Sequence, residues 1–383
     1  MLNCQKENFF IEPDVTYLNG AYMSPQLRRV EEVGIQALQR KNKPWTITPA
    51  DFFNEVEVLK GLFARLIHTD QPERVAVIPS VSYGIANAAR NIPFEKGDHI
   101  LILEKQFPSN YYEWADLARK KELVLDVVKA PDSLVGRGQA WNEKVLESIT
   151  QRTRVVAMEN VHWTDGTWFE VAQISRKIKA QGGFFIVDAT QSLGIFDFDQ
   201  NQVQADAVIA TGYKWLLGPY AIGCAYYGPA FDMGEPLEEN WINKQRSQEF
   251  EKILEYEERY RPGGARYGMG EQSQFVQVPM LCASLSQILE WGVVEMQTYC
   301  SDLVDKILPS LDQSSIWIEQ KAWRASHLFG LRTAGGFSPA IKQKLLDQKI
   351  FVSYRDDAIR VSPNVYNTAE DLFKLIDTIS SDY

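Results

Sequence analysis

Short, continuous runs of apolar residues alternate with amphipathic segments along the chain from about residue 75. Such runs are typical of buried parallel strands, because both faces of these strands are covered. The predicted strands are residues 74–79, 98–104, 123–129, 154–160, 184–189, 206–211 and 221–228. Between the earlier runs, helical spacing of apolar residues predicts helices over 82–92, 110–121, 142–149 and 170–183. The pattern therefore predicts a doubly wound α/β fold, a mostly parallel sheet flanked by helices.

The pattern changes after about residue 270. A long helical stretch over 274–308 precedes three strand-like runs and a last helix over 368–380, which Thr368 opens as a predicted N-cap. The three runs are residues 327–332, 350–355 and 358–363. These elements predict a second, α+β unit.

The change of pattern predicts two domains. We expect a large α/β domain over 15–270 and a smaller α+β domain over 271–383, with residues 1–14 packed on the smaller one. No linker rich in Pro, Gly or Ser separates the two, so they should pack together. Residues 235–262 are the most charged and least periodic part of the middle, which favours an excursion or a mobile flap.

Composition excludes several classes of function. Lys and Arg number 40 against 50 Asp and Glu, a net charge of -10, and no basic stripe is present, so nucleic acid is not an expected partner. No apolar run approaches the length of a membrane span, and the first residues lack the features of a signal peptide. We therefore expect a cytoplasmic protein that does not bind a membrane.

Cysteines and histidines are dispersed. Cys4, Cys224, Cys282 and Cys300 form no CxxC pair, and the four histidines show no metal-ligand spacing. The sequence therefore predicts reduced, mostly buried thiols and no metal site.

Two groups of opposite charge follow neighbouring apolar runs. Asp188 ends one predicted strand, and Lys214 stands just after the end of the next, in a setting that is otherwise apolar. Functional groups of doubly wound sheets collect at the carboxyl ends of strands. The two residues could form an ion pair, or the lysine stem could extend to water. They could also hold a pyridoxal ring between them, since that cofactor needs an amine for a Schiff base and a carboxylate beside its ring nitrogen.

Two further strand ends could complete such a site. Ser80, Val81, Ser82 and Gly84 lie where a strand gives way to a helix, and free backbone N–H groups there bind anions such as phosphate. Phe107 follows another strand and could stack on the ring. Taken singly, the first group could be an ordinary N-cap and Phe107 an ordinary core residue.

The motifs "DATQSLG" and "TGYKWLLGP" resemble those of class V aminotransferases. This family is the branch of the fold-type I pyridoxal-phosphate enzymes that holds cysteine desulfurases, kynureninases and isopenicillin N epimerase-like proteins. The resemblance runs from "YLNGAYMSP" near the start to "IRVSPNVYNTAEDL" near the end. It implies a mostly parallel, seven-stranded sheet flanked by helices, a smaller C-terminal domain and pyridoxal 5'-phosphate as cofactor.

The resemblance implies a role for each residue of the two motifs. Lys214 would carry the cofactor as a Schiff base, Asp188 would pair with the pyridine nitrogen, and Gln191 would hydrogen-bond the ring oxygen. Val81 and Ser82 would bind the phosphate.

It also implies that Thr211 and Tyr213, which flank the lysine, add donors to the phosphate, and that Phe107 stacks on the ring. Phe107 is followed by Pro, as in kynureninases, where desulfurases place a His.

Two residues are expected to meet the substrate. Arg360 matches the family arginine that binds the substrate carboxylate through its planar fork, although an arginine on a strand could equally form a surface salt bridge. Arg355 and Arg332 are weaker candidates for this role. Trp163 stands where desulfurases carry an Asn near the ring, and it could shape the substrate pocket or simply pack in the core.

The resemblance also implies a homodimer. Residues 263–266, Gly263 to Arg266, lie where relatives reach across the dimer interface toward the partner's cofactor phosphate, although a glycine pair can also be only a turn.

The expected reaction is transamination, epimerisation or β-elimination on a small amino acid. No cysteine follows Cys300, whereas desulfurases carry a nucleophilic cysteine in the C-terminal unit, so a persulfide relay is not expected. A cysteine or cystine C–S lyase, which needs no enzyme thiol, and a kynureninase-like hydrolase remain open. The alternative of another class is a catalytically silent homologue with a binding role.

Overall fold

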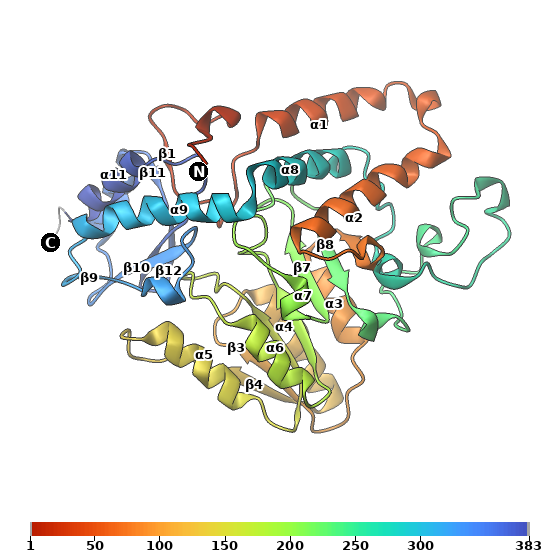
Figure 1. Cartoon of the computed structure of the whole chain (residues 1–383), viewed down its shortest axis with the longest axis horizontal. Coiled ribbons are helices and arrows are strands. Elements are labelled where there is room, and N and C mark those ends of the chain that lie inside the picture. Colours follow the sequence, from red (N-terminus) through yellow and green to blue (C-terminus); the bar gives the residue numbers. More distant parts are fainter. Residues whose placement is uncertain (1, 381–383) are drawn as a thin grey trace.

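The structure, a computed structural model, describes residues 2–380, so residues 381–383 of the expected C-terminal domain and Met1 lie outside it. A seven-stranded sheet forms the centre of the molecule (Figure 1). Its strands are β2 (Val75–Ile78), β3 (His99–Leu103), β4 (Val124–Val128), β5 (Thr153–Glu159), β6 (Phe184–Asp188), β7 (Ala207–Thr211) and β8 (Gly223–Tyr227). They lie in the order β2-β8-β7-β6-β5-β3-β4, and β8 alone runs antiparallel to its neighbours. The predicted mostly parallel sheet is therefore confirmed.

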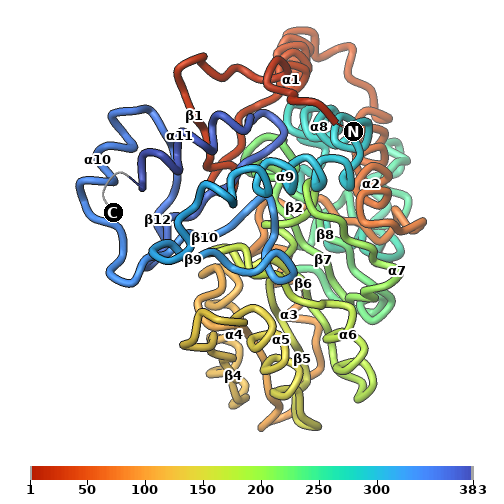
Figure 2. The backbone as a smooth tube through the Cα atoms, turned by 60° about the vertical axis from the view of Figure 1, so that its left-hand side comes forward, coloured from red at the N-terminus to blue at the C-terminus, as the bar shows by residue number. Residues whose placement is uncertain are grey.

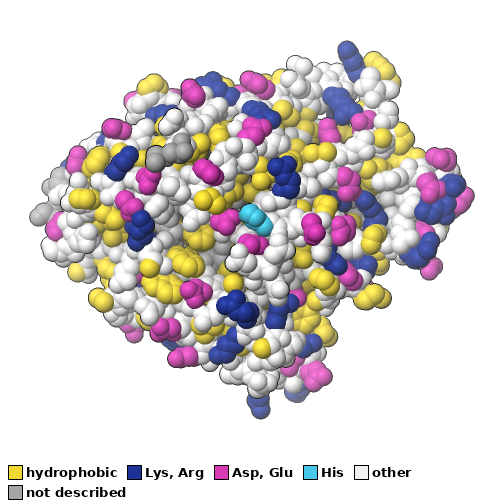
Figure 3. All heavy atoms as spheres, in the orientation of Figure 1, with side chains coloured by type: hydrophobic (Ala, Val, Ile, Leu, Met, Phe, Trp, Pro, Cys, Tyr) yellow, Lys and Arg dark blue, Asp and Glu magenta, His cyan; other side chains and the backbone are white. Residues whose placement is uncertain are grey.

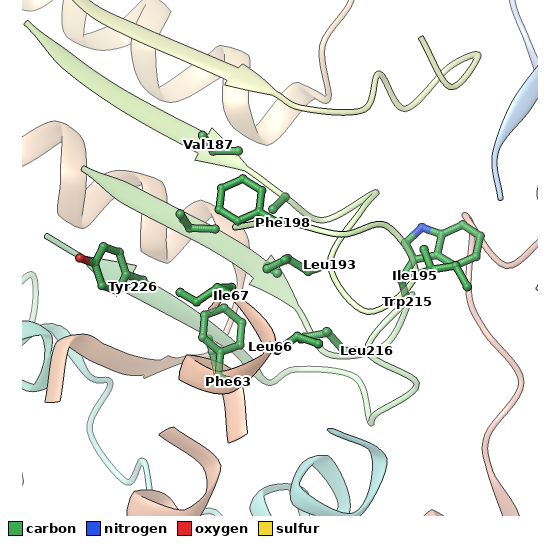
Figure 4. Close-up of a cluster of buried hydrophobic side chains, with 14 of the residues drawn as sticks. Phe63, Leu66, Ile67, Val187, Leu193, Ile195, Phe198, Trp215, Leu216 and Tyr226 are labelled. Atoms are coloured by element: carbon green, nitrogen blue, oxygen red, sulfur yellow. The ribbon is translucent and has the colours of Figure 1, made fainter. Parts of the chain in front are cut away.

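Helices cover both faces of this sheet. They are α1 (Arg28–Arg40), α2 (Asn54–Leu66), α3 (Val81–Arg90), α4 (Pro108–Lys121), α5 (Arg137–Ser148), α6 (Val171–Lys179) and α7 (Gln200–Val203). Because successive residues of a strand face opposite sides, Val75 and Val77 belong to one hydrophobic core, and Ala76 and Ile78 to the other. Figure 4 shows part of the first core, where Phe63 of α2 and its neighbours lie against the sheet.

A smaller sheet lies in the C-terminal part of the chain (Figure 2). Its antiparallel strands, in the order β12-β13-β10-β9, are β9 (Ile316–Ile318), β10 (Phe329–Thr333), β12 (Ser353–Arg355) and β13 (Ala358–Val361). The accompanying helices are α8 (Gln277–Trp291), α9 (Val293–Ile307), α10 (Pro339–Asp347) and α11 (Ala369–Ser380). A two-stranded parallel ladder joins β1 (Thr16–Tyr17) to β11 (Ile350–Phe351). An α+β C-terminal unit thus forms as predicted.

Some predicted elements are divided. The helical stretch 274–308 contains two helices, α8 and α9, because Gly292 between them has a φ of 80° and cannot continue the first. The run 350–355 contributes to two ladders, β11 and β12. The sequence pattern did not predict β9.

The first residues of the chain contact segments far along the sequence. The N–H of Gln5 donates to the carbonyl of Val365 at 2.7 Å, and the ring of Phe9 lies 5.0 Å from that of Tyr366. These contacts tie the N-terminal segment to the C-terminal part, while the boundary at residue 270 stays a prediction.

The charged segment 235–262 extends away from the body of the molecule (Figure 1). Trp241 and Phe250 pack together in it, with ring centroids 5.5 Å apart, while Leu254 and Tyr256 are exposed. Trp241 and Phe250 also pack on Phe52 and Phe53, which anchors this excursion to the segment before α2, and its mobility stays a prediction.

Charges of both signs are interspersed on the face drawn in Figure 3. Across residues 2–380 no helix has both the length and the apolarity that a membrane crossing requires.

Candidate active site

A cavity of about 320 Å³ opens at the carboxyl ends of the central parallel strands. Every cofactor-binding residue predicted from the sequence lines it, and so do the lysine and the tryptophan. These residues are Val81, Ser82, Phe107, Trp163, Asp188, Gln191, Thr211, Tyr213 and Lys214. The fold therefore brings together residues that are far apart in the sequence, since Val81 and Lys214 are separated by 133 positions.

Lys214 lies in the turn that follows β7 and is only 5% exposed. Its Nζ is 5.2 Å from the ring centroid of Phe107 and 5.6 Å from that of Tyr213, within the range of cation–π contacts. Burial lowers the pKa of Lys214 to about 8, although the charge of Asp188 opposes this. An amine with such a pKa is available as a nucleophile and as a base near neutral pH.

Asp188 ends β6 and is buried, with Oδ1 accepting the backbone N–H of Thr190 at 3.0 Å. Burial raises the pKa of its carboxyl group, and nearby Lys214 opposes that rise. A buried carboxyl group of this kind needs a cationic or N–H partner, which a protonated pyridine nitrogen would provide.

Glu159 is a site residue that sequence reasoning missed. It ends β5, directly beside Asp188 in the ladder, and both oxygens accept backbone N–H groups: Oε1 from Phe107 at 2.6 Å and Oε2 from Trp163 at 2.7 Å. Burial, followed by the charge of Asp188, raises the pKa of Glu159 to about 8. Its position at a strand end is the same signal that singled out Asp188.

Through these bonds Glu159 fixes two aromatic walls. The rings of Phe107 and Trp163 meet edge to face, with centroids 5.4 Å apart and planes at 87°. The indole N–H of Trp163 donates to the carbonyl of Lys105 at 2.7 Å, which fixes the ring further. Trp163 is thus held at the cavity wall rather than packed in the core.

The N-terminus of α3 faces the same cavity. Ser80 is its N-cap, and its Oγ accepts the N–H of Tyr83 at 3.2 Å and lies 3.0 Å from the Oγ of Ser82. The N–H groups of Val81 and Ser82 lie in the first turn of α3 and therefore have no carbonyl acceptor within the helix. This cradle of backbone and hydroxyl donors suits a phosphate.

Arg360, on β13, approaches the cavity from the C-terminal unit and is 1% exposed. Its Nη1 donates to the carbonyl of Trp163 at 2.9 Å and its Nη2 to Ser353 Oγ at 3.3 Å, while its Nε is sealed from solvent without an acceptor. Burial and the neighbouring Arg355 lower the pKa of Arg360 to about 9. No carboxylate of the described chain pairs with this guanidinium.

The other two arginines differ. Arg355 is half-buried, and its guanidinium lies 5.1 Å from the ring of Trp163, so it is close to the cavity. Arg332 forms salt bridges with Asp165 and Asp357 and is not free to bind a substrate.

The remaining predicted residues are placed as follows. Gln191 donates to the carbonyl of Ala21 at 3.2 Å and accepts the indole N–H of Trp215 at 2.9 Å, which leaves one amide N–H for the cavity. Thr211 and Tyr213 line the cavity, and the ring of Tyr213 lies 4.6 Å from that of Tyr220. Their roles as phosphate donors stay predictions.

Residues 263–266 do not line this cavity. They form a short 3-10 helix packed against Arg74, whose carbonyl lies 1.9 Å from where a Cβ on Gly264 would stand. Only glycine fits at this close approach.

The donor set fits pyridoxal phosphate. It offers an amine, a buried carboxyl group, an aromatic face and a helix N-terminus around one cavity. Arg360 does not line the cavity itself, but its guanidinium lies behind Trp163, which does, and its Nε has no hydrogen-bond partner.

The chain is similar to known proteins along most of its length. The family described as aminotransferase class-V matches residues 48–375. The uncharacterised aminotransferase YcbU of Bacillus subtilis is 24% identical over 85% of this chain and 84% of its own length.

Solved structures share the fold across both units. A cysteine desulfurase from Thermococcus onnurineus has a TM-score of 0.84 at 18% identity, covering 100% of this chain and 98% of that one. The cystine C-S lyase C-DES, in complex with cysteine persulfide, has a TM-score of 0.83 at 18% identity, covering 96% and 98%. The predicted fold-type I architecture is confirmed, and the match over residues 48–375 establishes that the chain belongs to the class V aminotransferase family.

Proposed function

We propose that the chain is a pyridoxal-phosphate enzyme that breaks a bond at or next to the α-carbon of a small amino acid. The cofactor and the class of enzyme follow from the family. The observation that supports the proposal most directly is Lys214: a nearly buried amine with a pKa of about 8, beside the carboxyl group of Asp188. When bound, pyridoxal phosphate supplies an electron-withdrawing ring that stabilises negative charge at the substrate's α-carbon.

Each residue of the chain has a distinct task in this proposal. Lys214 would hold the cofactor and would then take the proton from the substrate's α-carbon with its Nζ. Asp188 would keep the pyridine nitrogen protonated, Phe107 would pack on the ring, and Gln191 would donate to the ring oxygen.

The N–H groups of Val81 and Ser82 would bind the phosphate, and Thr211 and Tyr213 would add further donors. Arg360 binds the substrate carboxylate, which compensates its buried charge. Trp163 closes the side of the cavity next to Arg360.

The absorption spectrum of the purified holoenzyme tests this proposal. We expect a visible band from the bound cofactor that shifts with one member of a panel of amino acids and is absent from Lys214→Ala. Lys60→Met is a matched control, because Lys60 is also buried but pairs with Glu57 on α2, outside the cavity. It should keep the band. A colourless protein that cannot be reconstituted would instead support the silent homologue.

A cysteine or cystine C–S lyase is a second candidate, favoured by the state of the thiols. Cys224 and Cys300 are buried, and burial raises the pKa of both. Burial raises the pKa of Cys282 to about 12. No cysteine follows residue 300, so no thiol is available to carry sulfur away from this cavity.

Sulfur products from cystine distinguish this candidate from transamination and epimerisation. A lyase would release persulfide from cystine at an unchanged rate in a variant with all four cysteines replaced by serine or alanine. Loss of that release in a variant that still binds the cofactor would show that an enzyme thiol takes part.

We also propose a homodimer in the cytoplasm. Tyr220 lines the cavity and is 65% exposed, so a partner subunit would cover it. Gly264 and Ala265 are buried within their own chain, so the proposed approach of residues 263–266 to the partner's site rests on the resemblance to the family. The four free cysteines accord with a reducing compartment. Sedimentation should give a dimer, and a monomer with full cofactor affinity would contradict the proposal.

A further inference from the structure

Arg324 is, after Arg360, a second buried guanidinium that forms no salt bridge with a carboxylate of the described residues. It follows the short 3-10 helix Lys321–Trp323 and is 4% exposed. Its Nε and Nη1 are sealed from solvent and have no hydrogen-bond partner, and its guanidinium lies 5.8 Å from the ring centroid of Phe329. A buried charge destabilises a fold unless it is paired. Arg324 is therefore a place where an anion from outside the chain would stabilise the protein.

Arg324 lines a groove of about 680 Å³ that shares no residue with the cavity around Lys214. Helix α9, which spans much of the molecule in Figure 1, provides one wall. The residues of that wall are Val294, Gln297, Thr298, Ser301 and Asp302. The size of the groove is in the range of small-molecule sites.

The opposite wall of the groove is aromatic. Trp168 and Phe196 are half-buried there, with ring centroids 6.1 Å apart. Trp168 also stacks on Trp323, with centroids 5.7 Å apart and planes at 22°. The planes of Trp168 and Phe196 are tilted by 47°, and an aromatic wall of this kind can pack against the ring of a ligand.

The carboxylates near Arg324 already have other hydrogen-bond or ion-pair partners. Asp305 accepts Lys321 Nζ at 2.5 Å, and Glu319 accepts the N–H groups of Gly138 and Gln320. Asp197, at the rim, bonds His68. Asp302 also lines the groove, so a ligand must place its negative end at Arg324 rather than along α9.

We propose that this groove binds a small organic carboxylate that carries an aromatic ring. The carboxylate would pair by charge with the guanidinium of Arg324, and the ring would pack against the aromatic wall that Trp168 and Phe196 form. The site is separate from the one that binds the amino-acid substrate.

Calorimetric titration of the holoenzyme with benzoate, phenylacetate and indole-3-carboxylate tests the proposal. We expect at least one to bind saturably, with benzamide, the uncharged analogue of benzoate, as the matched ligand control. Arg324→Gln should weaken binding by about tenfold or more, because the charge-assisted pair is lost. No saturable binding of any of the three, or equal binding of an acid and its amide, would overturn the proposal.

A second variant covers the risk that Arg324→Gln does not fold. Ser301→Glu puts a carboxylate on the groove wall and should also weaken binding by about tenfold, through charge repulsion and loss of space. Ser310→Glu, an exposed Ser outside the groove, should bind as the unmodified chain does. Binding that survives Ser301→Glu but is lost in Arg360→Gln would place the ligand at the active site and overturn the proposal.

Discussion

The carboxyl group of Glu159 should make the stability of the cofactor-free chain depend on pH. Its pKa rises from 4.5 to about 8 on folding, because the group is buried next to Asp188. Between these values the folded chain holds a proton that the unfolded chain has released, so the free energy of unfolding should fall as pH rises. For one group acting alone the slope is about 1.4 kcal/mol per pH unit.

Denaturant unfolding at several pH values in this window measures the slope. Glu159→Gln should flatten it, and it should also loosen Phe107 and Trp163, since an amide cannot accept both of their N–H groups. Glu104→Gln is the matched control, because Glu104 also accepts a backbone N–H at a strand end, from Ala130. An unchanged slope in Glu159→Gln would contradict the assignment.

Single residues could be predicted from sequence where their chemistry is unusual for their position. Lys214 and Asp188 stood out as charges at the ends of apolar runs, and the cavity contains both. Glu159 had the same signal, but its meaning depends on two backbone N–H groups brought from other segments. Arg324 had no signal at all, because what distinguishes it is the absence of a partner in three dimensions.

At the level of elements, Gly292 separates α8 from α9 and should not tolerate a side chain. Its φ of 80° is outside the range that L-residues prefer, and a Cβ there would stand 2.1 Å from the carboxylate of Glu295. Gly292→Ala should therefore lower the free energy of unfolding by about 1 kcal/mol or more. The melting temperature should fall.

Gly61 offers a control of opposite sign. It lies inside α2, and nothing stands within 4 Å of an added Cβ. Gly61→Ala should raise stability by about 0.5 to 1 kcal/mol, because alanine favours the helix. A melting temperature that rises or stays the same in Gly292→Ala would show that the break at Gly292 is not a conformational requirement.

Strands that are buried on both faces were easier to predict from the sequence than the short strands. Most strands of the central sheet, such as β2, β5 and β7, are apolar runs buried on both faces and were predicted from that pattern. The edge strand β4 was predicted as well, although it is only partly buried. β1 and β11 have two residues each and carry no periodicity to detect. The break at Gly292 was missed because one glycine is often tolerated in a helix.

At the scale of the whole molecule, Asp165 connects the central sheet region to the C-terminal unit. It is 2% exposed and accepts Arg137 Nη1 and Arg332 Nη2, each at 2.9 Å. Arg137 begins α5, whereas Arg332 lies on β10. Burial opposes ionisation of Asp165, but Arg137, His162 and Arg332 together hold its pKa below its usual range. The carboxylate thus stays charged at neutral pH and compensates both arginines.

Two variants at this junction should show that a buried ion pair contributes more to the free energy of unfolding than an exposed one. Asp165→Asn leaves two buried guanidinium groups facing each other, so we expect a loss of about 3 to 5 kcal/mol in the free energy of unfolding at neutral pH. Asp356→Asn breaks the exposed pair with Lys105, Nζ to Oδ2 at 2.8 Å, and should cost less than about 1 kcal/mol. Because the pKa of Asp165 is depressed, its contribution should disappear as pH falls below the usual range of an aspartate, and the two variants should then converge. Equal losses at neutral pH would mean that Asp165 does not hold the two units together.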